Sequence, residues 1–423
     1  MHGMRKMEEW KEYKLSELLE IPIRNGLTKP KAIRGQGVKM IGMKEIFAYD
    51  IIRNCDMELV PITDKELASS SIIEEDLLFA RQSLTLEGAG KCSIVGSVNN
   101  DTVFESHLIR VRINKKLANP YFIYYYFNSR YGKEQIKGLV QQVAAAGIRG
   151  KELINLMIKC PSLPTQQKIA NILSSLDDKI EVNRRINEQL EELAQALFKS
   201  WFVDFEPFKD GEFVESELGM IPEGWKVGEL SEIGDIVGGA TPSKSNEDYY
   251  TENGISWITP KDLSINKNKF IDKGETDITE LGYSKCSAKL MPKGSVLFSS
   301  RAPIGYIAIA KKELCTNQGF KSVVPKYAGT AFIYFYLKNN VSNIESMASG
   351  STFKEASGTL MKSLKVIVPP SNLLQDFEEK VCSIFDKQET LEEEITHLTA
   401  LRDTLLPKLM SGEIDVEQFN VIE

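Results

Sequence analysis

The sequence repeats itself, and this repeat constrains the fold more than any other feature. Four strings recur in the same order: Trp10-Lys11 with Leu15-Ser16-Glu17 as Trp225-Lys226 with Leu230-Ser231-Glu232, Leu78-Phe79 before Arg81 as Leu297-Phe298 before Arg301, FIYYYF at 122–127 as FIYFYL at 332–337, and Pro161 with Gln167 as Pro369 with Gln375. The spacing between copies drifts around 210 residues, so the loops differ in length. Such a unit is far longer than a solenoid repeat, and it predicts a tandem duplication of a domain with its connector.

Each copy divides into a globular part and a connector. Short β-rich runs separated by turn residues, with one aromatic stretch per copy that is predicted to be helical (120–129 and 330–340), favour a mixed α/β domain. We expect four segments, which are globular domains at 1–160 and 216–370 and connectors at 161–215 and 371–423. The predicted fold class is therefore mixed α/β, with two similar globular domains alternating with two long coiled-coil helices in a pseudo-twofold tandem duplication.

Each connector begins after a proline and then continues without Pro or Gly, to about Phe202 in the first copy and about Leu406 in the second. A run of about 36 residues would form a helix of about 54 Å. Apolar residues seven apart predict a coiled-coil seam of eight positions: Leu176, Asn183, Leu190, Leu197, Ile384, Leu391, Leu398 and Leu405. Asn183 is either a buried amide that fixes register and partner, or a tolerated residue in a partly exposed seam.

The chain carries a net charge of −7, which is unusual for a protein that binds nucleic acid. By segment, however, Lys and Arg outnumber Asp and Glu by 24 to 19 in residues 1–160 and by 18 to 16 in 216–370. They are outnumbered by 6 to 11 in 161–215 and by 4 to 13 in 371–423. Basic domains could thus contact phosphates while the acidic connectors stay away from them, although acidic helices are also simply soluble.

No catalytic constellation is visible. A DNA methyltransferase needs a glycine-rich turn for its methyl donor and an N-P-P-[YF] loop, whereas Asn119-Pro120-Tyr121-Phe122 reads as an N-cap with Pro in the first helical turn. The three histidines have no ligand partner at useful spacing, and the six cysteines are far apart. We therefore expect no catalytic residue, no metal site and no cofactor, and a reducing, cytoplasmic environment.

The polar and basic residues of the loops are suited to DNA recognition and not to catalysis. Arg can bind guanine, Asn or Gln can bind adenine, and Lys, Ser and Thr can bind phosphate. The candidate DNA-binding residues are Lys31, Arg34, Lys44, Arg81, Gln82, Ser83, Gln141 and Arg149 in the first copy, and Thr241, Ser243, Lys244, Thr259, Lys261, Ser300, Arg301, Asn317, Gln318, Ser351, Thr352 and Lys354 in the second.

Several strings resemble a known family, the specificity (S) subunits of type I restriction-modification systems. The segment 163–205 is similar to the central conserved region of that family, and 297–325, GGATP at 238–242, 348–357 and 401–414 are similar to further parts of it. The resemblance covers essentially the whole chain, and the first domain matches least, since it carries neither a GGxTP nor an NQGF string.

The resemblance implies two target-recognition domains, each of which reads half of a split site in double-stranded DNA. It implies two helices packed antiparallel that set the spacer, two methyltransferase (M) subunits that dock on them, and a restriction and translocase (R) subunit. Methyl transfer and cleavage would belong to those partners, and no membrane is involved. Two other readings remain at this point: a single-chain DNA modification enzyme, and a coiled-coil scaffold whose domains bind something other than DNA.

Overall fold

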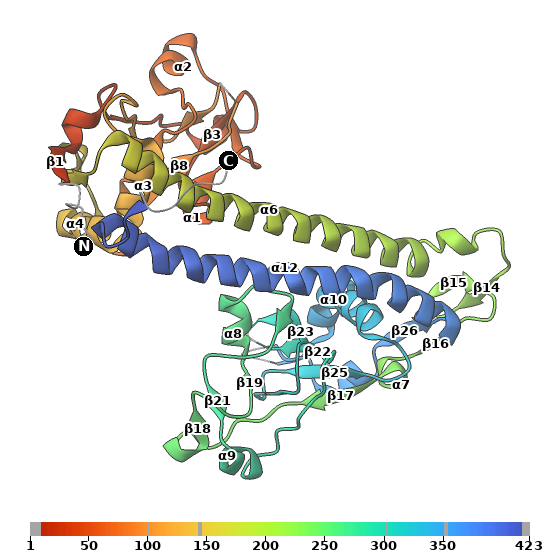
Figure 1. Cartoon of the computed structure of the whole chain (residues 1–423). Coiled ribbons are helices and arrows are strands. Elements are labelled where there is room, and N and C mark those ends of the chain that lie inside the picture. Colours follow the sequence, from red (N-terminus) through yellow and green to blue (C-terminus); the bar gives the residue numbers. More distant parts are fainter. Residues whose placement is uncertain (1–9, 100, 143–145, 302, 351–353, 417–423) are drawn as a thin grey trace. The chain divides into compact units, whose positions relative to one another are not determined.

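The computed structural model describes residues 10–99, 101–142, 146–301, 303–350 and 354–416. The chain forms two compact units (Figure 1). One unit comprises Met1–Ile180 with His397–Glu423, and the other comprises Glu181–Thr396. Both boundaries fall inside long helices, because each unit packs its globular domain on a part of α6 (Leu163–Phe202) and a part of α12 (Ser371–Ser411).

The first unit contains a five-stranded sheet in the order β2-β10-β6-β8-β4. Its remaining strands form a pair, β1-β13, and two three-stranded sheets, β5-β3-β9 and β11-β12-β7. The elements are β1 (Lys11–Lys14), η1 (Leu15–Leu18), β2 (Arg24–Asn25), η2 (Lys31–Ile33), β3 (Val38–Ile41), α1 (Met43–Ala48), β4 (Ile51–Ile52), β5 (Glu58–Val60), α2 (Asp64–Ser70), β6 (Leu77–Ala80), β7 (Gln82–Ser83), β8 (Cys92–Val95), β9 (Val103–Phe104), β10 (Leu108–Val111), α3 (Pro120–Asn128), α4 (Arg130–Leu139), β11 (Gln141–Gln142), β12 (Ala146–Gly147), α5 (Gly150–Leu153) and β13 (Met157–Cys160).

The second unit has the same plan. Its five-stranded sheet has the order β17-β25-β22-β23-β20, and β16 pairs with β26 as β1 pairs with β13. The elements are η3 (Glu206–Phe208), β14 (Phe213–Ser216), β15 (Gly219–Pro222), β16 (Lys226–Glu229), α7 (Leu230–Ile233), β17 (Gly234–Gly238), η4 (Glu247–Tyr249), β18 (Tyr250–Thr251), β19 (Trp257–Ile258), α8 (Pro260–Ile265), β20 (Phe270–Ile271), β21 (Asp277–Ile278), α9 (Glu280–Ser284), β22 (Val296–Ser300), β23 (Ile304–Ala310), β24 (Cys315–Thr316), β25 (Lys321–Pro325), α10 (Thr330–Met347), α11 (Gly358–Lys362) and β26 (Lys365–Val368).

The strand directions also match between the two sheets. In each sheet three neighbouring pairs are antiparallel, and the edge strand β4 or β20 is parallel to its neighbour. A mixed sheet with one parallel edge, repeated in the same order, is the product of a duplicated domain. The mixed α/β fold class with a tandem duplication is thus confirmed.

The aromatic helix predicted in each copy is present as α3 and α10. Asn119 caps α3, its side chain accepting a hydrogen bond from Phe122 N at 2.9 Å, and Pro120 lies in the first turn. This is the N-cap arrangement expected from the sequence, since Pro has no N–H to leave unpaired there.

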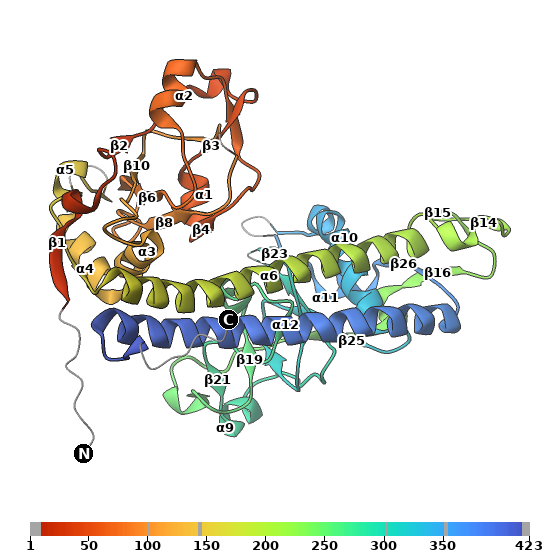
Figure 2. The ribbon, with the colours of Figure 1, turned by 45° about the horizontal axis from the view of Figure 1, so that its top comes forward.

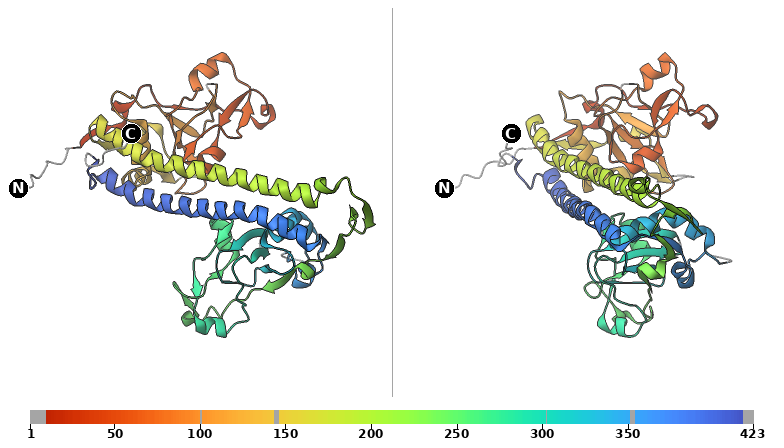
Figure 3. Two further views of the ribbon diagram at one scale, coloured as in Figure 1. Left: turned by 45° about the vertical axis from the view of Figure 1, so that its right-hand side comes forward. Right: turned by 90° about the vertical axis from the view of Figure 1, so that its right-hand side faces the viewer.

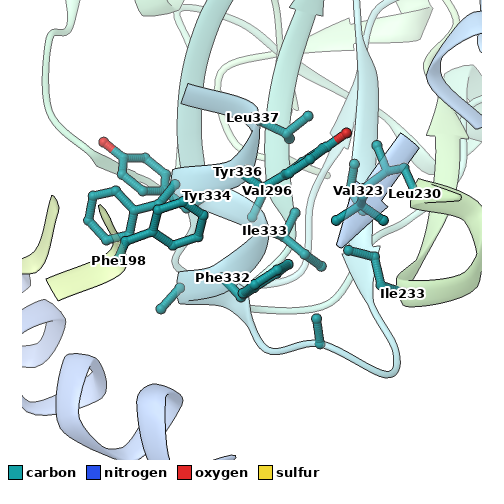
Figure 4. Close-up of a cluster of buried hydrophobic side chains, with 14 of the residues drawn as sticks. Phe198, Leu230, Ile233, Val296, Val323, Phe332, Ile333, Tyr334, Tyr336 and Leu337 are labelled. Carbon is teal, nitrogen blue, oxygen red and sulfur yellow. The ribbon is translucent and has the colours of Figure 1, made fainter. Parts of the chain in front are cut away.

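The core of the second unit joins its sheet to the helices. Phe332 of α10 packs with Phe198 of α6, while Val296 and Val323 of the sheet lie on the other side of α10 (Figure 4). The Phe198 ring also contacts the rings of Phe335 and Phe377, the latter from α12, at centroid distances of 5.8 and 6.0 Å. The core of the first unit is built alike, with Ile169 and Leu173 of α6 and Leu409 and Met410 of α12 in one cluster with α3.

The two helices therefore pack together within each unit, and they do so antiparallel. In the first unit Asp177 of α6 lies against Arg402 of α12, whereas in the second Asn187 lies against Gln388 and Phe198 against Phe377. Figures 2 and 3 show α6 in yellow-green and α12 in blue lying side by side. The helix α12 continues past Pro407, where the sequence predicted its end near Leu406, because Leu409 and Met410 are buried in the first core.

Candidate nucleic-acid interface

Seven of the predicted reading residues of the second copy line one open cavity of about 670 Å³. They come from the loop after β17, the start of α8, the end of β22 and the turn after β24. These residues are Thr241, Lys244, Thr259, Lys261, Arg301, Asn317 and Gln318. Segments 77 residues apart in the sequence thus meet at a single polar site, where Thr241 donates a hydrogen bond to Gln318.

Local contacts hold the loops that form this cavity. The Asn317 side chain accepts from Gly319 N at 2.8 Å, which shapes the turn that presents Gln318 to solvent. Trp257 Nε1 donates to Ala240 O at 2.9 Å and so fixes the loop before Thr241. These bonds hold the backbone of the loops that carry the outward side chains, so the loops are formed before any ligand binds.

Two cations of the cavity have acidic neighbours. Lys261 Nζ lies 2.5 Å from Glu275, which raises the pKa of this lysine, and Arg301 lies 3.8 Å from Glu355. Lys244 is exposed and has no ion pair within the described part of the chain. Lys244 is therefore the cation most ready to meet a phosphate, while Lys261 and Arg301 must exchange a carboxylate for one.

The other predicted residues of the second copy lie around this cavity or outside the described residues. Ser243 is exposed and within 2.8 Å of Ser245 Oγ, and Lys354 is exposed. Ser300 is fully buried and its hydroxyl donates to Gly319 O at 3.1 Å, so this residue supports the turn instead of facing a ligand. Ser351 and Thr352 lie outside the described residues.

In the first copy, two separate predicted strings come together on the sheet β11-β12-β7. Gln82 and Ser83 form β7, which pairs with β12, and β12 pairs with the strand that holds Gln141. Arg149 precedes α5, and its neighbour Ile148 donates to Arg81 O at 3.0 Å. Arg81 itself is partly buried and donates to Ser106 O at 3.4 Å.

The remaining basic residues of the first copy differ in how free they are. Arg34 pairs with Glu58 at 2.5 Å and donates to Lys29 O, so most donors of its guanidinium already have partners within the domain. Lys31 and Lys44 are exposed, and neither has an ion pair among the residues that the structure describes. Like Lys244 in the second domain, these two lysines are available to contact a phosphate.

The predicted seam residues are buried to different degrees. Asn183 and Leu391 are buried, whereas the other six, Leu176, Leu190, Leu197, Ile384, Leu398 and Leu405, are half-buried. Further buried side chains of α12 lie seven residues apart, as do Leu374, Val381 and Gln388. On α6, Leu173 and Ile180 are buried at the same spacing. This is the heptad spacing of a coiled-coil seam.

Buried polar groups tie each domain to the helices beside it. In the second unit Lys269 contacts Glu191 and lies 2.6 Å from Gln388 Oε1, with the ring of Phe385 4.1 Å away. Burial lowers the pKa of Lys269 to about 8 even with Glu191 beside it. In the first unit Asp177 accepts from Tyr125 at 2.6 Å and pairs with Arg402 at 2.7 Å.

No group of His, Cys, Asp and Glu within the described ranges could hold a metal ion, and no described helix is long and apolar enough to cross a membrane. The fold and the site define a class of protein: a tandem pair of α/β domains, each packed on a shared pair of long antiparallel helices, with polar and basic loops on the domains.

Comparison with known proteins identifies that class. The model of the type I restriction modification DNA specificity domain matches residues 7–192 and again 222–398, so the chain belongs to this family. It is the non-catalytic DNA specificity subunit of a type I restriction-modification system. The resemblance predicted from the sequence is thereby confirmed, and the alternatives of a single-chain enzyme and a non-DNA scaffold are excluded.

Two curated relatives and one solved structure are similar to the chain. The HindI specificity subunit of Haemophilus influenzae is 27% identical over 96% of this chain and 100% of its own length. The MjaIX specificity subunit of Methanocaldococcus jannaschii is 36% identical over 49% of this chain and 48% of its own length. The crystal structure of a type I S subunit from M. genitalium covers 96% of this chain and 97% of that one with a TM-score of 0.62 at 17% identity, which supports the fold.

Proposed function

We propose that each globular domain reads one half of a bipartite DNA site and that the helix pair sets the unread spacer between the halves. The observation that carries this proposal is the cavity of the second domain, where polar and basic residues from four separate segments meet. Arg301 and Gln318 offer base contacts there, and Lys244 offers a phosphate contact. In the first domain, Gln82, Ser83, Gln141 and Arg149 would serve the same purpose.

We further propose that the acidic connectors bind the partner subunits. Residues 161–215 and 371–423 hold the chain's acidic excess, which suits contact with protein and disfavours contact with phosphate. Two methyltransferase (M) subunits would dock on the helices, and restriction (R) subunits would join the complex in the cytoplasm. In this proposal the recognition domains span residues 1–160 and 216–370, and the connectors span 161–215 and 371–423.

The salt dependence of DNA binding tests the proposal. The double variant Lys44→Ala/Lys244→Ala removes one exposed, unpaired cation from each domain. If both lysines contact phosphates, the slope of log affinity against log salt becomes shallower by about 2, at about 0.9 per phosphate. The measurement is a fluorescence titration of the complex with methyltransferase subunits on DNA from 50 to 200 mM salt.

The matched control is Lys133→Ala/Lys285→Ala, which removes from each domain one exposed lysine outside the proposed reading residues and changes the net charge equally. It should leave the slope unchanged. Equal slopes for the test and control variants would exclude Lys44 and Lys244 from the DNA interface.

A further inference from the structure

The two globular domains can be matched residue by residue through their backbone hydrogen bonds. In the second domain Ala240 N donates to Thr316 O at 3.0 Å, and in the first Leu27 N donates to Phe104 O at 2.8 Å. Thr316 ends β24, which pairs in parallel with β19, the strand before α8. Phe104 ends β9, which pairs in parallel with β3, the strand before α1. Position 316 of the second domain thus corresponds to position 104 of the first.

The residues that follow keep this correspondence. Asn317 N donates to Ile258 O at 2.9 Å, and Glu105 N donates to Ile41 O at 3.0 Å. Two residues on, Gly319 O accepts from Ser300 N, while His107 O accepts from Arg81 N, both at 2.7 Å. The turn Asn317-Gln318-Gly319 of the second domain is therefore Glu105-Ser106-His107 in the first.

A close backbone approach confirms the match from the other side of the turn. A Cβ on Gly239 would lie 2.1 Å from Asn317 O, and a Cβ on Gly26 would lie 2.5 Å from Glu105 O. Only glycine fits at either position. Gly26-Leu27-Thr28 is thus the first domain's version of Gly239-Ala240-Thr241. It escapes a search for GGxTP because Asn25 stands in the place of Gly238 and Lys29 separates Thr28 from Pro30.

The helix beside the turn matches as well. Thr259 N is capped by Asp262 at 2.7 Å, and Gly42 N is capped by Glu45 at 2.8 Å. The second residue of each helix is a lysine, Lys261 in one domain and Lys44 in the other.

We propose that Ser106 and His107 determine the base specificity of the first domain, as counterparts of Gln318 and Gly319 in the second. This inference rests on the proposed reading function of the two domains. Among the matched positions, His107 adds a large side chain where the second domain has none, and its side chain is 55% exposed, 3.7 Å from Glu105. A hydroxyl and an imidazole can each donate or accept a hydrogen bond, as readout of base edges requires.

Arg81 and Ser300 occupy equivalent positions, because their backbone groups make equivalent hydrogen bonds. Gln82 is therefore the counterpart of Arg301. Arg81 O accepts from Ile148 N at 3.0 Å, and Ser300 O accepts from Ala356 N at 2.9 Å. Glutamine pairs with adenine and arginine with guanine. The two domains therefore hold side chains of different base preference at one equivalent position, which explains how one fold reads two sequences.

The test maps methylated bases on random DNA after treatment with the chain complexed to its methyltransferase subunits. Ser106→Ala/His107→Ala should reduce discrimination at one or two base pairs of a single half-site by at least about fivefold, from the loss of one base contact. Gln82→Arg should change the preferred base in that same half-site. Lys133→Ala, at an exposed lysine of α4 outside the proposed reading residues and the connectors, is the control and should leave both half-sites unchanged.

The variants Gln318→Ala and Arg301→Ala separate this inference from the function on which it rests. If these two relax the other half-site while Ser106→Ala/His107→Ala relaxes neither, the inference fails and the proposed function stands. If no variant relaxes any position, the proposed function fails too. If Ser106→Ala/His107→Ala lowers methylation equally at all sites in a correctly assembled complex, the pair supports binding without selecting bases, and the inference is overturned.

Discussion

Shortening both helices by one heptad should shorten the unread spacer and leave both half-sites intact. The deletion removes residues 179–185 of α6 and 394–400 of α12. It retains the contacts that tie the domains to the helices, including those of Asp177 with Arg402 and of Glu191 with Lys269. Seven residues make two helical turns less about 20°, so the buried stripes on either side of the deletion stay nearly in line.

The magnitude follows from helix geometry. Seven residues at 1.5 Å each shorten a helix by about 10.5 Å, and this equals about three base pairs at about 3.4 Å each. Removing three base pairs also turns one half-site about the DNA axis by about 100°, given 10 to 10.5 base pairs per turn. Because the helices turn by only about 20°, the DNA must twist, and we expect slower methylation at the new sites.

The assay is methylated-base mapping with the double-deletion chain in complex with methyltransferase subunits. Val182→Ala changes the same segment without changing its length and should keep the original spacer. A spacer that stays the same in the double-deletion protein, with both half-sites still methylated, would refute the idea that the helices set the distance.

Three further predictions concern the groups buried against the helices. Asn183→Leu should raise the free energy of unfolding by about 1–3 kcal/mol, because both polar atoms of this buried amide lack a partner among the described residues. Chemical denaturation measures this free energy, and a decrease would show that the amide is paired. Asp177→Ala should lower the free energy of unfolding by about 2–3 kcal/mol, because it leaves the Tyr125 hydroxyl and the Arg402 guanidinium without their acceptor. A loss under about 0.5 kcal/mol would contradict these contacts. Burial lowers the pKa of Lys269 to about 8, so this lysine loses its proton at a lower pH in the folded protein than in the unfolded protein. The wild type should therefore gain stability relative to Lys269→Met as the pH rises from about 8 to about 10.5. Parallel profiles of stability against pH would refute this prediction.

The sequence predicted the duplication because the repeated strings lie in the core. FIYYYF and FIYFYL form the buried faces of α3 and α10, where packing keeps aromatic residues in place. The long helices were predicted because residues 165–202 and 371–406 contain no Pro or Gly, and the predicted end of the second helix near Leu406 was wrong, since α12 continues through Pro407 to Ser411. There the burial of Leu409 and Met410 outweighs the hydrogen bond that proline cannot donate.

The reading residues were harder to predict, because short polar loops carry no periodic pattern. The seven residues around the second domain's cavity were found through motifs, but Ser300 is buried, and its position next to Arg301 gave no sign of this. Thr28, Ser106 and His107 were missed entirely. Their equivalence to the second domain is carried by backbone hydrogen bonds, which bring together segments with no shared letters beyond a glycine and a threonine.

We expect the chain to read two separate DNA sequences through its two domains. The decisive measurement is a map of every methylated base in DNA treated with the wild-type chain and its methyltransferase subunits. The map should show two short specified elements separated by a constant number of unspecified base pairs. A single continuous motif, or methylation without any shared sequence, would refute recognition by two domains.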